Sequence, residues 1–152
     1  MNNEQLAEVR KIREYAEVRY GSKIPCCRMA YVVNQVLGFD IEVGWASVAD
    51  NKRTFQCWNW NEEDKETIDV AADQIEGMCE KILVCPNNDV VPICYDYSPL
   101  AELIYKIYIV VDGRRRERDH KDYLKFRETG TVPSNVEKKG VSLVDFLGEI
   151  RS

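Results

Sequence analysis

The chain has 152 residues, 45% of them hydrophobic and 10% aromatic, which suits one globular domain with its own core. Its 26 acidic and 21 basic residues give a formal net charge of −5, which disfavours a nucleic-acid partner. The charged amino-terminal segment lacks the pattern of a secretory signal, and no apolar run approaches the roughly 18 residues of a membrane-spanning helix. We therefore expect a single cytoplasmic domain over residues 1–152 that binds no membrane.

Six cysteines are distributed along the chain: Cys26, Cys27, Cys57, Cys79, Cys85 and Cys94. Because the cytoplasm keeps thiols reduced, the sequence favours free cysteines over disulfides. A structural zinc site needs closely spaced ligands, but the sequence has no CxxC pair, and the single histidine, His120, is remote from the cysteines. We expect no metal and no other cofactor.

Two helices are predicted at the start of the chain. In residues 4–20, apolar side chains recur three or four positions apart with charged residues between them, as on a helix with one apolar face. Gly21 and Ser22 end this helix, and Pro25 begins a second one, because proline is tolerated in a first helical turn. The second helix ends at Gly38 and is more apolar, so it is expected at the centre of the domain.

The next part of the chain alternates as strands do. FDIEVGWASVA and RTFQCWNWN each place large apolar residues at every second position, with the turn-forming ADNK between them. In the second segment, Cys57 lies on one face of the strand and Gln56 on the other. After the turn NEEDKE, TIDV is a third short strand. Helices followed by an antiparallel meander predict an α+β fold.

The rest of the sequence predicts further helices. Residues 76–97 are expected to be loop and short strand, and Ser98 and Pro99 are typical of a helix cap and first turn for LAELIYKIYIVV. The charged segment DGRRRERDHKDYLKFRE is predicted as a polar helix or loop with a solvated face. Ser142 caps a final predicted helix, GVSLVDFLGEI.

Cys26 and Cys27 lie where the second helix begins. A helix N-terminus lowers the pKa of a thiol, because its free N–H groups and its dipole favour negative charge, and a nucleophilic cysteine needs a lowered pKa. Cysteine is also a small hydrophobic residue that is often simply buried. Position alone leaves both interpretations open.

Three motifs follow one another in the order PCCRMAYVVNQVLG, FQCWNW and IDVAADQI. This order resembles the transglutaminase-like and papain-like cysteine enzymes, particularly small bacterial and phage-type members, over about residues 25–75. The resemblance implies a cysteine-bearing helix packed on an antiparallel sheet, and thiol hydrolase or acyltransferase chemistry on amide or ester bonds. It assigns the nucleophile to Cys26, with Cys27 as the close alternative, and the orienting acid to Asp69.

The catalytic histidine of that family is missing. Its place is Gln56 if the family pattern is H-x-W, and Cys57 if the pattern is H-W. Glutamine cannot act as a general base, and a second thiolate would be repelled by the first. Because losing a general base costs typically 10²–10⁴-fold in rate, we expect impaired or altered catalysis.

Three alternatives remain open. The chain is either a thiol hydrolase-like protein with a weakened site, or a non-catalytic module that binds a protein or peptide on the same fold, or an enzyme that uses His120 or a water-mediated base. A further alternative is a disulfide between Cys57 and Cys26 or Cys27 under oxidation. The sequence assigns no oligomeric state.

Two smaller expectations concern side chains beside these motifs. Trp45, Trp58 and Trp60 are expected in the core, because large aromatic residues dominate protein cores. Asp73 and Gln74 are expected to cap the short helix that follows the third strand.

Overall fold

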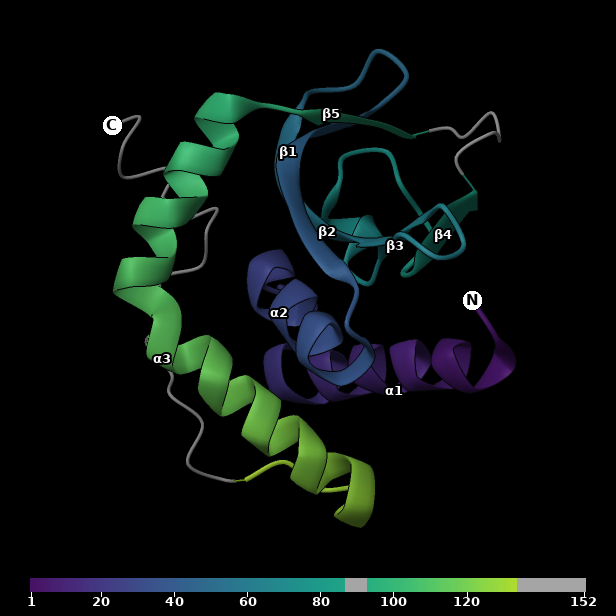
Figure 1. Cartoon of the computed structure of the whole chain (residues 1–152), viewed down its shortest axis with the longest axis vertical. Coiled ribbons are helices and arrows are strands. Elements are labelled where there is room, and N and C mark those ends of the chain that lie inside the picture. Colours follow the sequence, from purple (N-terminus) through teal and green to yellow (C-terminus); the bar gives the residue numbers. More distant parts are fainter. Residues whose placement is uncertain (87–92, 134–152) are drawn as a thin grey trace.

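A computed structural model of the chain describes residues 1–86 and 93–133 (Figure 1). Its elements are α1 (Asn3–Tyr20), α2 (Cys26–Leu37), β1 (Asp40–Val48), β2 (Thr54–Asn61), β3 (Glu66–Asp69), the 3₁₀ turn η1 (Ala72–Gln74), β4 (Leu83–Pro86), β5 (Ile93–Tyr97) and α3 (Pro99–Thr129). The predicted helix near Ser142 lies outside the described residues, as does the side chain of Cys94.

The two amino-terminal helices confirm the sequence prediction, including their ends. The Asn2 side chain accepts a hydrogen bond from the Gln5 backbone N–H at 2.8 Å, and the Gln5 side chain accepts one from the Asn2 N–H at 3.0 Å. This reciprocal cap satisfies two N–H groups that a helix start would otherwise leave unpaired. Helix α2 ends at Gly38, whose φ of 75° is left-handed and therefore suits glycine.

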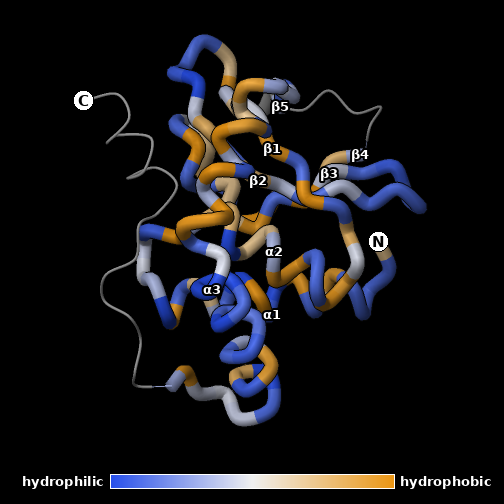
Figure 2. The backbone as a smooth tube through the Cα atoms, turned by 60° about the vertical axis from the view of Figure 1, so that its left-hand side comes forward, coloured by the Kyte–Doolittle hydropathy of each residue, from blue (hydrophilic) through white to orange (hydrophobic). Residues whose placement is uncertain are grey.

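The five strands form one open antiparallel sheet in the order β4-β3-β2-β1-β5. In the β1–β2 pair, Val43 is opposite Cys57 and Gly44 is opposite Gln56. Helix α2 packs on β2 and β1, and α1 and α3 lie against α2 (Figure 1). The fold is thus α+β, with hydrophobic stretches of β1, β2 and α2 together at the centre (Figure 2).

Helix α3 is a single helix of 31 residues, longer than the apolar segment that predicts it. It begins as expected, with the Ser98 hydroxyl accepting a hydrogen bond from the Ala101 N–H at 3.3 Å. Its charged second half stays helical because one face is buried against α1, where the Tyr15 ring lies 5.8 Å from that of Tyr123 and 5.7 Å from that of Phe126. Among the described residues, no helix is long and apolar enough to span a membrane.

Candidate functional site

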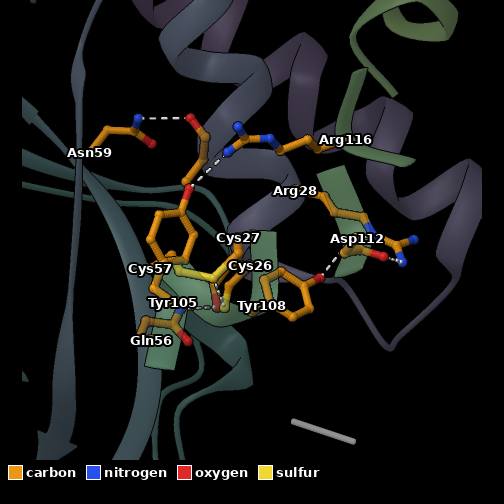
Figure 3. The surroundings of a disulfide bond; sticks show 12 residues. Cys26, Cys27, Arg28, Gln56, Cys57, Asn59, Tyr105, Tyr108, Asp112 and Arg116 are labelled. Carbon is orange, nitrogen blue, oxygen red and sulfur yellow. Dashed lines mark hydrogen bonds and ion pairs between the residues drawn. A yellow bond between two sulfur atoms is a disulfide. The ribbon is translucent and has the colours of Figure 1, made fainter. Parts of the chain in front are cut away.

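The three central cysteines come together where α2 begins. Cys26 and Cys27 are the first residues of α2, and Cys57 lies on β2 beneath them. Cys27 and Cys57 form a disulfide, with their Cα atoms 5.0 Å apart (Figure 3). The expectation that the cysteines are all reduced is therefore wrong for this pair, whereas the alternative of a Cys57 disulfide is confirmed with Cys27 as the partner. Packing of a helix end on a strand brings the two residues together across 30 positions of sequence.

Cys26 keeps its thiol but is buried. Its Sγ lies 3.9 Å from that of Cys27, and the sulfurs of Cys26, Cys27 and Cys57 all lie within 4.8 Å of one another. Burial raises the pKa of the Cys26 thiol to about 12, although hydrogen bonds from the backbone of Cys57 and Cys27 act in the opposite direction. The prediction of a lowered thiol pKa at this helix start is therefore wrong, because desolvation of the thiolate outweighs the favourable backbone amides.

Gln56 and Asp69 form the second half of the candidate site. The Gln56 amide Nε2 donates to both carboxylate oxygens of Asp69, at 3.2 and 3.0 Å, and to the Ala71 carbonyl at 3.1 Å. Asp69 also accepts hydrogen bonds from the Ala71 N–H at 2.9 Å and from the Tyr95 hydroxyl at 2.8 Å. Burial raises the pKa of Asp69 to about 6, and these donors limit the rise by favouring the carboxylate.

The two halves lie on opposite faces of β2. Cys57 points toward α2, where it bonds Cys27, and Asn59 on the same face donates to the Ala30 carbonyl of α2 at 2.9 Å. Since successive side chains of a strand point to opposite faces, Gln56 points away from α2, toward Asp69 and the segment after β3. All five predicted site residues thus lie in one region, but β2 separates the three cysteines from Gln56 and Asp69.

His120 lies far from the cysteines. Tyr105 of α3 is beside the cysteine cluster (Figure 3). His120 follows it by 15 residues on the same helix, which corresponds to about 22 Å of helix length. Burial and the charge of Arg127 lower the pKa of His120. His120 therefore lies too far along α3 to act as a base for Cys26.

Asp73 and Gln74 do not cap η1, so this prediction is wrong. The Arg13 guanidinium of α1 binds both carboxylate oxygens of Asp73, at 2.7 and 2.6 Å. The Gln74 amide donates to the Ser22 carbonyl at 3.0 Å. Arg13 is buried, and a buried guanidinium requires a counter-charge, which explains why Asp73 turns toward α1.

The three tryptophans have different surroundings. Trp58 is 3% exposed and packs on Tyr95, with ring centroids 4.8 Å apart, so it belongs to the core as expected. Trp45 is half-buried against Phe55, and Trp60 is half-exposed and donates its indole N–H to Glu62 at 2.6 Å. The core prediction is therefore confirmed for Trp58 and only partly for the other two.

The sequence prediction missed the tyrosines of this region. Tyr95 reaches Asp69 from β5, and Tyr105 and Tyr108 of α3 lie beside the cysteines (Figure 3). Their spacing in the sequence gives no local sign of these contacts, because each comes from an element far along the chain.

Comparison with known proteins adds no relative. No protein-family model matches the chain, and neither the curated proteins nor the solved structures contain a significant match.

Proposed function

We propose that the chain is a transglutaminase-like or papain-like domain in which hydrolysis is lost or strongly impaired, and that it acts by binding a protein or peptide. The order of helices and strands along the chain supports the proposed relationship to these domains. A cysteine-bearing helix is followed by antiparallel strands that carry Gln56 and then Asp69, as the resemblance implies.

One observation carries the loss of catalysis: β2 separates the cysteine sulfurs from the Gln56–Asp69 pair. A thiol enzyme needs a base within hydrogen-bond reach of its thiol, and an acid that orients that base. Here the residue facing the cysteines is Cys57, which is joined to Cys27. The residue facing the acid is Gln56, which cannot accept a proton near neutral pH. Cys26 is buried, and the raised pKa of its thiol keeps it protonated.

A groove between α3 and the sheet supports the binding role. It encloses about 310 Å³ and is lined by Ile41, Glu42, Val43, Tyr97, Glu102, Tyr105, Lys106 and Ile109. The apolar members suit an apolar side chain of a ligand, and Glu42 suits a basic group, whereas Glu102 lies 3.7 Å from Lys106.

Peptide selection on the full-length chain tests the binding role. We expect peptides selected from a random display library to bind the groove, and Ile109→Glu to weaken them tenfold or more, because it places a charge against their apolar side chain. Val110→Glu is the matched control, since this neighbouring residue lies outside the groove lining. Equal binding to both variants, or no selected peptide at all, would contradict the binding role.

Residual hydrolysis is a second candidate, favoured by the contact of Cys57 with the cysteines at the helix start. If Cys57 occupies the place of the lost histidine, Cys57→His should gain activity on an activated ester under reducing conditions. Gln56→His is the matched control, because position 56 faces away from α2. No gain for Cys57→His, or an equal gain for both variants, would remove this candidate.

A further inference from the structure

We propose that Cys26, Cys27 and Cys57 form a three-sulfur binding site for a soft thiophilic ion, such as Cu(I), once the Cys27–Cys57 disulfide is reduced. This inference does not depend on the proposed function. It concerns only the cluster at the start of α2 (Figure 3).

The spacing of the sulfurs fits a three-coordinate ion. With metal–sulfur bonds of about 2.3 Å in a trigonal plane, ligand sulfurs lie about 4.0 Å apart. The Sγ atoms of Cys26 and Cys27 are already 3.9 Å apart, and all three sulfurs lie within 4.8 Å of one another. Reduction removes the covalent bond between Cys27 and Cys57, so that their sulfurs can separate to the same spacing while their Cα atoms remain near 5.0 Å.

The ligand set selects for a soft ion over zinc. Structural zinc takes four ligands, whereas the described residues supply a cluster of three cysteines. The neighbouring acid, Asp69, is engaged by Gln56, Tyr95 and a backbone N–H on the other side of β2. Thiolate ligands without oxygen or nitrogen favour Cu(I) among the biological ions.

Burial excludes water from the cluster and disfavours free thiolates, but the helix start offsets part of that cost. Cys26 and Cys27 occupy the first turn of α2, where unpaired N–H groups and the helix dipole stabilise negative charge. The three cysteines are 6%, 2% and 1% exposed, and Tyr105 and Tyr108 lie beside them (Figure 3). A cation bound between the sulfurs would offset the cost of burying thiolates, and the apolar shell would protect it from solvent.

A phosphine can reduce the Cys27–Cys57 disulfide before the ion binds. The phosphine and one water convert the disulfide into two thiols, and the phosphine becomes its oxide. Cu(I) then binds without changing its oxidation state, and the displaced thiol protons pass to the buffer.

The test is a titration of the reduced full-length chain with Cu(I), without oxygen, against a chromogenic chelator that competes for the ion. We expect one equivalent to bind, with ultraviolet sulfur-to-copper absorption, and X-ray absorption to report three sulfur neighbours. Wild-type protein with its disulfide intact should not compete. Binding of equal strength by the oxidised chain, binding with two sulfurs only, or stronger binding of Zn(II) would overturn the proposal.

Cys26→Ser is the decisive variant, because Cys26 is outside the disulfide and the oxidised variant can be checked for native folding by near-ultraviolet circular dichroism. We expect it to lower Cu(I) affinity by at least about 10–100-fold, the loss typical of even an outer-shell partner of a metal. The exposed Cys79 and the buried Cys85 provide matched Cys→Ser controls that should bind as wild type does. An unchanged affinity in Cys26→Ser, or an equal loss in a control, would contradict the site.

Discussion

Two buried aspartates have very different neighbours. Asp112 on α3 is 1% exposed, and both its oxygens accept hydrogen bonds from the Arg28 guanidinium at 2.8 Å. Asp69 is also 1% exposed, but its side-chain donors are neutral: the Gln56 amide and the Tyr95 hydroxyl. A full opposite charge lies against Asp112, whereas partial charges only limit the rise of the Asp69 pKa, to about 6. Asp112 thus belongs to a fixed ion pair, and Asp69 to a site that responds to pH.

The largest expected effect comes from removing the cation beside Asp112. Arg28→Met should lower the free energy of unfolding by up to about 3–5 kcal/mol, because it removes the two-bond ion pair of buried Asp112 and leaves the single Arg115 contact at 3.2 Å. Urea denaturation at pH 7 measures the change. Arg53→Met is the control, since Arg53 and Asp96 form an exposed pair and its loss should cost at most about 1 kcal/mol. Equal losses for both variants would mean that burial does not distinguish the two pairs.

The pH dependence of the free energy of unfolding tests the raised pKa of Asp69. Its pKa is about 6 in the folded chain, compared with about 3.9 in an unfolded one. Between these values the folded state binds more protons, so this group makes stability fall as the pH rises from about 4 to about 6, by about 2–3 kcal/mol. Asp69→Asn should lack that decline, which urea denaturation at several pH values can measure. Curves for the variant and wild type that stay parallel across this range would contradict the assignment.

The smallest expected effect concerns the amide beside Asp69. Gln56→Leu should cost about 1 kcal/mol, because the buried oxygens of Asp69 and Ala71 each lose one donor and keep another. It should also raise the pKa of Asp69 further, since the amide favours the carboxylate. A nuclear magnetic resonance titration of the Asp69 carboxyl carbon measures the shift, with the exposed Gln35→Leu as control. A lowered or unchanged pKa would show that the amide does not hold this carboxylate.

Much of the framework follows from local patterns in the sequence. The apolar spacing of residues 4–20, Gly38 at the end of α2, and the alternation in β1 and β2 predict these elements as the structure has them. These signals are local, since each depends on residues within a few positions. The full length of α3 is different, because its charged half stays helical through Tyr123 and Phe126, which pack on α1.

The candidate site was predictable residue by residue but not as an assembly. Alternation places Gln56 and Cys57 on opposite faces of their strand, and Asp69 follows from the end of the third strand. The choice of Cys27 as the partner of Cys57 required the position of the α2 start over β2. Adjacent cysteines at a helix start point in different directions, and a shift of one residue changes which of them meets the strand.

The sequence by itself determined the first two helices, the first three strands, the α+β class and the faces of β2, because periodicity and turn residues act over short distances. Only the tertiary structure decided that Cys27 is oxidised, that Cys26 is buried with a raised thiol pKa, and that Arg28 rather than a neutral group meets Asp112. Such outcomes depend on desolvation and on contacts between distant segments, which exist only once the helices have packed on the sheet.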